Sequence, residues 1–141
     1  TVGGVTVIDD FAHHPTAIAT TIAGLRARMR AGSHPGGRLL AVLEPRSNTM
    51  RTGTLKAQLP ASLKDADLVF CYAGGIDWDA QAALAPLGER VAVLRDMPAL
   101  EAAILAAARP GDQVLVMSNG GFGGIHGRLL TGLASREGNG K

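Results

Sequence analysis

The residues best suited to chemistry gather in three short segments, and the first runs from Asp9 to Thr16. It reads Asp-Asp-Phe-Ala-His-His-Pro-Thr and so combines carboxylates, imidazoles and an aromatic ring. A carboxylate accepts from ribose hydroxyls, an aromatic ring stacks on a base, and an imidazole donates to a ligand. A helix is expected to follow, and its free N–H groups would favour an anion. In the simpler alternative, Asp10 or His14 only caps this helix. Adjacent side chains rarely converge on one ion, so no metal site is expected.

The second segment runs from Glu44 to Arg51 and reads Glu-Pro-Arg-Ser-Asn-Thr-Met-Arg. Arg46 and Arg51 frame three small polar side chains directly after an apolar run. Arginine forks bind carboxylates and phosphates through two parallel hydrogen bonds. The arrangement therefore suits a ligand with several carboxylates. The alternative that remains open is that Arg46 pairs with Glu44 and merely stabilises the loop.

The third segment runs from Ser118 to His126 and has four glycines between residues 119 and 124. Glycines permit positive φ and a close approach of backbone to ligand, as in anion-binding nests. A plain tight turn is the alternative, although one or two glycines would serve it. A dinucleotide fingerprint is disfavoured because the segment follows the fifth expected strand rather than the first. No Gly-x-x-x-x-Gly-Lys-Ser/Thr loop occurs anywhere in the sequence, so an ATP-using enzyme would need its phosphate-binding loop elsewhere.

These segments need a scaffold, and the apolar pattern predicts one of alternating strands and helices. Five short apolar runs are expected as strands: Val5–Ile8, Arg38–Leu43, Asp67–Tyr72, Arg90–Leu94 and Gln113–Met117. A helix is expected to open at Pro15, with the apolar stripe Ile18, Ile22, Leu25 and Met29. Further helices are expected over 55–63, interrupted by Pro60, weakly over 79–84, from Met97 to Ala108, and from Ile125 through Leu133.

Strands that are apolar on both faces and alternate with helices are typical of a parallel sheet covered on both sides. We therefore expect an α/β fold, with a three-layer, mostly parallel, Rossmann-like sheet of about five to six strands. Ligands of such sheets bind beyond the carboxyl ends of the strands. All three polar segments follow expected strands and so fall at that edge.

Composition limits the remaining possibilities. The chain has 141 residues, 46% hydrophobic and 18% charged, which is typical of one folded domain and excludes a disordered chain. No apolar stretch approaches the ~20 residues of a membrane helix, and no signal peptide is expected. A single cysteine, Cys71, excludes an internal disulfide and is expected to be a buried, inert thiol in a reducing compartment, the cytoplasm.

Basic residues give little support to nucleic-acid binding. The net charge is +2, and the chain has one Trp and one Tyr. The only basic cluster contains Arg26, Arg28 and Arg30, and we interpret it as a solvated helix face. No nucleic acid and no membrane are therefore expected as partners.

Taken in order, the three segments resemble the signatures of the C-terminal domain of the Mur ligase family, and in particular its murein peptide ligase branch. The related ligases that add L-alanine have Tyr-Gly in place of Phe11-Ala12, and they lack the Gly-Gly-Phe-Gly-Gly loop. The resemblance spans Val5 to about Leu133. It implies a Mur ligase C-terminal domain over residues 1–134, followed by a disordered tail over 135–141. Because the chain starts at Thr1 rather than Met, we expect an excised third domain.

The resemblance implies an ATP-dependent ligase of peptidoglycan recycling. Such a ligase joins UDP-N-acetylmuramate to the recycled murein tripeptide through an acyl phosphate. The N-terminal domain of the same chain would hold the UDP-sugar, and the central domain would hold the phosphate-binding loop and Mg²⁺. This chain alone should then be inactive. The alternative is a stand-alone, nucleotide-responsive α/β binding or regulatory domain. A dinucleotide-dependent oxidoreductase is disfavoured, because this sequence has no glycine-rich turn after its first expected strand.

The resemblance also implies roles for individual residues, none of them catalytic in this domain alone. The family positions that lie near the adenine and ribose of the nucleotide are matched by Asp10, Phe11 and His13. The loop facing the peptide substrate is matched by Arg46, Ser47, Asn48, Thr49 and Arg51. The loop at the far end of the tripeptide is matched by Asn119, Gly120, Gly121 and Phe122.

Overall fold

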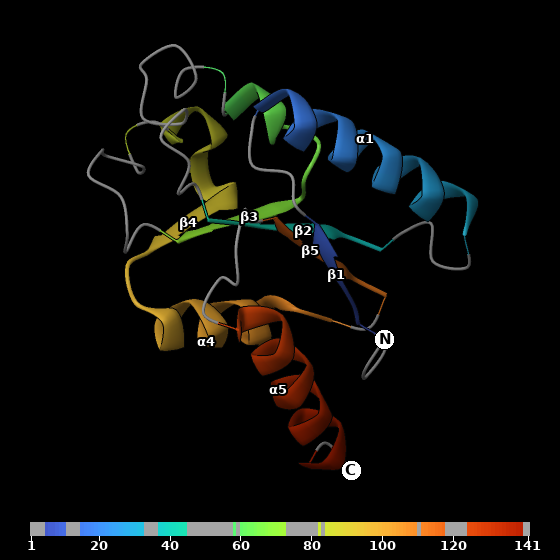
Figure 1. Ribbon diagram of the computed structural model, residues 1–141, viewed down its shortest axis with the longest axis vertical. Helices are drawn as coiled ribbons and strands as arrows, with labels where there is room; N and C mark the ends of the chain where they lie inside the picture. The colour runs from blue at the N-terminus through green and yellow to red at the C-terminus, as the bar shows by residue number, and fades with distance from the viewer. Residues whose placement is uncertain are drawn as a thin grey trace.

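A five-stranded, all-parallel sheet forms the centre of the computed structural model (Figure 1). The structure describes residues 5–10, 15–32, 37–44, 58, 60–72, 82, 84–109, 111–117 and 124–139. The strands are β1 (Thr6–Asp10), β2 (Leu39–Leu43), β3 (Leu68–Tyr72), β4 (Val91–Leu94) and β5 (Gln113–Met117). Their order across the sheet is β1-β5-β2-β3-β4, and every neighbouring pair is parallel. The expected fold class is confirmed, with five strands in the described part of the chain.

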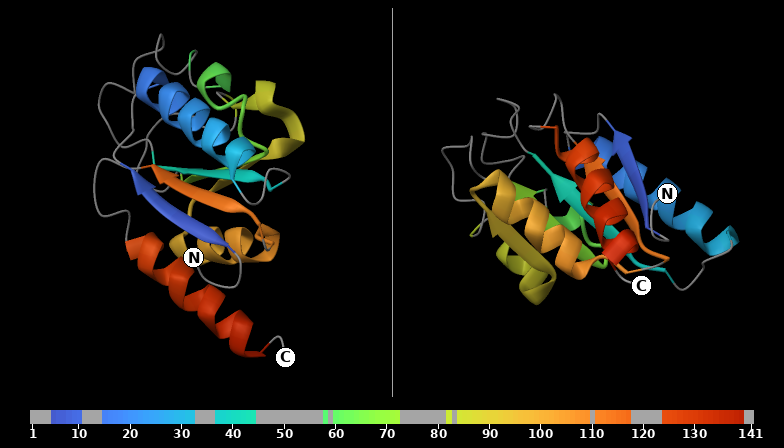
Figure 2. Two further views of the ribbon diagram at one scale, coloured as in Figure 1. Left: turned by 90° about the vertical axis from the view of Figure 1, so that its right-hand side faces the viewer. Right: turned by 90° about the horizontal axis from the view of Figure 1, so that it is seen from below.

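Helices cover both faces of this sheet, as Figures 1 and 2 show. Helix α1 (Pro15–Ala31) lies on one face, together with the residues around the 3-10 helix η2 (Ala85–Arg90). Helices α4 (Met97–Ala107) and α5 (Ile125–Asn139) lie on the other. The three layers agree with the expected architecture.

Strand β2 shows why its sequence is apolar without alternation. Leu39, Ala41 and Leu43 pack into the core beneath α1. Leu40 and Val42 point the other way and pack into the core beneath α4 and α5. All five side chains are buried, because a central parallel strand is covered on both sides.

The expected apolar stripe of α1 is confirmed, since Ile18, Ile22, Leu25 and Met29 are all buried. Helix α4 is also confirmed. Its N-cap, Asp96, accepts a hydrogen bond from the Ala99 N–H at 3.0 Å, as a capping aspartate should.

Two aspartates that the sequence analysis did not single out fix the amino end of β2. The Asp67 carboxylate accepts from the Leu39 N–H at 2.7 Å and from Arg26 Nη2 at 2.8 Å. The Asp112 carboxylate accepts from the Arg38 N–H at 3.2 Å and from Arg38 Nη2 at 2.7 Å. Arg26 therefore anchors α1 to the sheet edge and is not part of a purely solvated face, unlike the exposed Arg28 and Arg30.

The described part of the chain departs from the expected elements in two places. In the 55–63 helix, the described helical residues are Gln58 and 60–62, and the chain turns at Leu63. A 3-10 helix, η2, occupies 85–90, where none was expected; Gly88 interrupts it with a φ of 66° that favours glycine. Helix α5 runs from Ile125 to Asn139, and the predicted tail over 135–141 stays a prediction. None of the described helices is long and apolar enough to span a membrane.

Candidate functional site

The carboxyl ends of three adjacent strands form one row at the edge of the sheet. Strand β5 lies between β1 and β2, and Met117 pairs in register with Asp10 on one side and Leu43 on the other. Adjacent strands lie about 4.8 Å apart, so the row from Asp10 to Leu43 spans roughly 10 Å. The three polar segments of the sequence therefore leave the sheet side by side, although they are far apart in the chain.

Glu44 ties the second segment to this row. Its N–H donates to the Met117 carbonyl at 3.2 Å, one residue after β2 ends. The residue is only 3% exposed, although its side chain is a carboxylate. The second segment thus starts from a fixed, buried position rather than from a free loop.

Asp10 is the one predicted site residue in the described part of the chain. It is the last residue of β1, is half-buried, and stands directly before the segment that leads into α1. The remaining predicted site residues lie outside the described residues: Phe11, His13, Arg46, Ser47, Asn48, Thr49, Arg51, Asn119, Gly120, Gly121 and Phe122. Their roles stay predictions, whereas the strand ends from which their segments start are brought together.

The described residues offer neither a metal centre nor a reactive thiol. They contain no group of three or more His, Cys, Asp or Glu side chains that could hold a metal ion. Cys71 is buried in β3, and burial raises the pKa of its thiol to about 12. A thiol with that pKa stays protonated and is a poor nucleophile near neutral pH.

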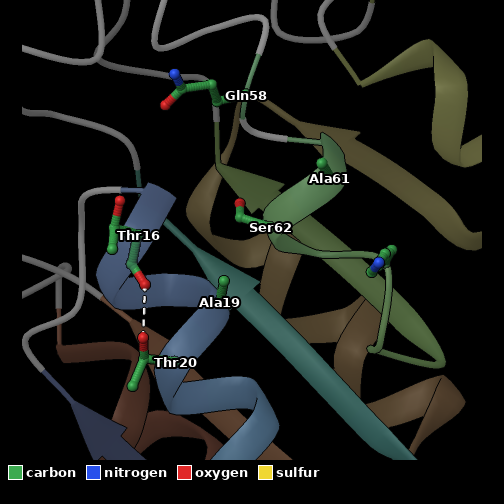
Figure 3. Close-up of a pocket in the computed structure, with 7 residues that line it drawn as sticks. Thr16, Ala19, Thr20, Gln58, Ala61 and Ser62 are labelled. Carbon is green, nitrogen blue, oxygen red and sulfur yellow. Dashed lines mark hydrogen bonds between the residues drawn. The ribbon is translucent and has the colours of Figure 1, made fainter.

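A groove of about 430 Å³ opens beside the first turns of α1 (Figure 3). Thr16, Ala19 and Thr20 of α1 form one wall. Residues from the segment that precedes β3 form the other: Gln58, Ala61, Ser62 and Lys64. Apart from Thr16, the last residue of the first segment, these residues belong to no sequence motif, because isolated alanines, hydroxyls and a single lysine carry no signal.

Comparison with known proteins gives one consistent result. The family model described as Mur ligase, glutamate ligase domain, matches residues 1–120. The UDP-N-acetylmuramate–L-alanyl-γ-D-glutamyl-meso-2,6-diaminoheptanedioate ligase of Escherichia coli (strain K12) is 47% identical over 134 residues, which cover 94% of this chain. That alignment covers 28% of the E. coli protein, so the chain spans little more than a quarter of this relative's length.

Two solved structures share the fold. One is a domain from a UDP-N-acetylmuramate:L-alanyl-γ-D-glutamyl-diaminopimelate ligase of Haemophilus ducreyi, with a TM-score of 0.78 and 46% identity; the match covers 95% of each chain. The other is a murein peptide ligase from Psychrobacter arcticus, with a TM-score of 0.81 and 38% identity over 94% of this chain and 28% of that one. The Haemophilus domain therefore has nearly the same extent as the present chain.

Proposed function

The chain belongs to the Mur ligase family, and we propose that it is the C-terminal domain of a murein peptide ligase. In this proposal the full-length protein joins UDP-N-acetylmuramate to the recycled tripeptide L-alanyl-γ-D-glutamyl-meso-diaminopimelate. The 47% identity to the E. coli ligase of that name supports the choice of substrates. The UDP-sugar site belongs to a further N-terminal domain, and the phosphate-binding loop and Mg²⁺ belong to a central domain.

The observation that carries the proposal is the aligned row of Asp10, Met117 and Leu43. In this row, three segments begin at the ends of neighbouring strands: the nucleotide-side segment after β1, the glycine-rich segment after β5 and the arginine-rich segment after β2. A ligase must hold an activated carboxylate and an attacking amine close together, and orientation of this kind removes much of the entropic barrier. A single edge that contacts both substrates is suited to that task.

The residues of this domain bind and orient the substrates. Asp10, Phe11 and His13 bind adenine and ribose. The side chains from Arg46 to Arg51 clamp the carboxylates of the tripeptide, and the backbone from Asn119 to Phe122 faces its far end. ATP supplies the phosphoryl group that activates the muramyl carboxylate, and the free α-amine of the tripeptide then displaces phosphate. Closure of this domain over the central one excludes water, which protects the acyl phosphate from hydrolysis.

The test uses the full-length protein with purified substrates. We expect phosphate release that requires ATP, UDP-N-acetylmuramate and the tripeptide together, and no turnover by residues 1–141 alone. L-Alanine replaces the tripeptide in a parallel reaction, because the related ligases that add L-alanine share much of the first segment. Turnover with L-alanine and none with the tripeptide would overturn the proposal.

A further inference from the structure

We propose that the groove between α1 and residues 58–64 seats one carboxylate of the peptide substrate, with the Lys64 ammonium as its counter-charge. The inference rests on the proposed function and adds a subsite to it. No motif of the sequence pointed to this groove. The position, the charge and the size of the groove support this assignment.

The groove lies between two of the three polar segments. Thr16, on its α1 wall, is the last residue of the segment that begins at the end of β1. Gln58, on the opposite wall, follows the arginine-rich segment that begins after β2 (Figure 3). A helix that follows a parallel strand starts near the carboxyl edge of the sheet, so this end of the groove opens beside the proposed substrate site.

The charge of the groove favours an anion. Among the described residues of its lining, Lys64 is the only charged one, and it forms no salt bridge within the described part of the chain. The Asp67 carboxylate, three residues further along the chain, is engaged by Arg26 at 2.8 Å. The backbone of Lys64 is itself fixed, because its carbonyl accepts from Arg90 Nη1 at 2.9 Å. The Lys64 backbone is thus fixed beside the groove, and none of the described ion pairs gives its ammonium an acidic partner.

The donors present fit a carboxylate better than a polyphosphate. The Thr20 hydroxyl already donates to the Thr16 carbonyl at 3.0 Å, as Figure 3 shows. The Gln58 amide and the Lys64 ammonium can supply the hydrogens for two oxygens. Polyphosphates are usually held by several cations or by a nest of backbone N–H groups. A single cation with an amide matches one carboxylate.

The size of the groove suits one or two peptide residues. Its volume of about 430 Å³ falls in the range of small-molecule sites. Along α1, the wall from Thr16 to Thr20 rises about 6 Å. An extended chain advances about 3.4 Å per residue, so this wall accommodates roughly two residues. Ala19 and Ala61 face the space with small side chains, which leaves it open.

The proposed substrate carries more than one carboxylate, and each needs a binding position. The peptide named for the E. coli relative carries carboxylates on its γ-linked glutamyl residue and on its diaminoheptanedioate residue. Arg46 and Arg51 would serve the carboxylates near the strand ends. The groove then receives a carboxylate that projects away from the reacting amine, along α1.

The test is an amide-shift NMR titration of the 141-residue chain with the tripeptide. A Haemophilus domain of nearly the same extent has been crystallised by itself, which supports the use of the isolated chain. We expect saturable shifts at Thr20, Gln58 and Lys64, and weaker binding after Lys64→Gln. An exposed ion pair gives a loss of about twofold to fivefold. Ala61→Leu, which fills the groove without changing its charge, should also weaken binding.

Matched controls and separate probes decide between the outcomes. Arg28→Gln removes an exposed cation and Ala23→Leu enlarges an exposed alanine, both on α1 outside the groove lining, and neither should change the dissociation constant. Inorganic phosphate and ATP should leave the groove amides unshifted, and equal shifts with either would overturn the choice of a carboxylate.

The strand ends distinguish failure of the subsite from failure of the proposed function. Shifts at Asp10, Glu44 and Met117 alone, with an unchanged dissociation constant for Lys64→Gln, would overturn the groove and leave the proposed function standing. Absence of shifts at both places at millimolar tripeptide, together with no tripeptide-dependent turnover by the full-length protein, would overturn both.

Discussion

Arg38 and Asp112 join the start of β2 to the start of β5 through three hydrogen bonds. Asp112 accepts from the Arg38 N–H at 3.2 Å, from Nε at 3.3 Å and from Nη2 at 2.7 Å. Arg38 Nη2 also donates to the Ala107 carbonyl at 2.6 Å, at the C-terminus of α4. The hydrogen bonds that the Arg38 guanidinium donates to Asp112 raise its pKa. This pair holds the edge of the sheet opposite to the proposed site.

Replacement of Asp112 by alanine should destabilise the domain by about 3 kcal/mol. The residue is 3% exposed and also accepts from the Arg109 N–H at 2.9 Å, so its loss leaves several donors unsatisfied. Removing one partner of a buried pair costs about 3–5 kcal/mol, and the partial exposure of Arg38 favours the lower end. Urea unfolding followed by circular dichroism measures the free energy of unfolding. Glu101→Ala, which removes a more exposed pair with Arg128 at 3.4 Å, is the control and should cost at most about 1 kcal/mol. Equal losses for the two variants would contradict the assigned role of Asp112.

Two glycines of α5 should respond in opposite directions to alanine. A Cβ on Gly132 would lie 2.6 Å from Leu105 Cδ1 of α4, whereas a Cβ on Gly127 would meet nothing within 4 Å. Gly127→Ala should stabilise the fold by up to about 1 kcal/mol through helix propensity. Gly132→Ala should lose that gain to overpacking, which costs about 1–3 kcal/mol. Thermal unfolding of both variants checks this, and adding Leu105→Ala should remove the difference between them. A difference that persists in the Leu105→Ala background would mean that the contact is not its cause.

Cys71 should make the stability of the domain fall at alkaline pH. Burial raises the pKa of its thiol from 9.0 to about 12. Between these two values the unfolded chain loses the proton and the folded chain keeps it, so the free energy of unfolding decreases as pH rises. From pH 8 to pH 10 the wild type should lose about 1.4 kcal/mol more than Cys71→Ala. Paired urea titrations at the two pH values measure this difference. Rapid reaction of the native protein with a thiol reagent at pH 8 would argue against a buried thiol.

Substitutions on the nucleotide side and on the peptide side of the proposed site should change different KM values of the full-length protein. Arg46→Ala should raise the KM for the tripeptide by about tenfold or more, the value of one charge-assisted hydrogen bond. Asp10→Ala should instead raise the KM for ATP by a similar factor, because one ribose contact is lost. Arg28→Ala, on the exposed part of α1, is the control and should change neither constant. The reverse pattern would show that the nucleotide and peptide sides have been exchanged.

The sequence predicted the parts of the fold that depend on local apolar pattern. The runs at Leu39–Leu43 and Gln113–Met117 became buried strands, and the stripe from Ile18 to Met29 became the buried face of α1. In these elements burial and local propensity favour the same structure. The expectation that three polar segments follow strand ends depended on the same pattern.

Features that depend on contacts between distant residues were not predicted. The position of β5 between β1 and β2 follows from packing of the whole sheet, and the apolar residues of a strand do not specify its neighbours. The role of Asp112 was missed because one aspartate after Pro110-Gly111 looks like an ordinary turn residue. Asp67 and Lys64 were also missed. The residues that they contact or face lie on other elements, which the local sequence does not reveal.

The place of β5 in the sheet has a consequence for the order of folding. Thr6 and Leu39 both pair with Gln113, so the strand that joins β1 to the rest of the sheet is synthesised after the other four described strands. Until it emerges from the ribosome, β1 has no neighbour among the described strands, and β2 exposes one edge. Pairing across such sequence separations slows folding, because a long loop must close before its contacts form. A nascent chain that stops before residue 113 would thus carry an unpaired β1 and an open edge on β2, and completion of β5 should convert it to the native domain in one late, cooperative step.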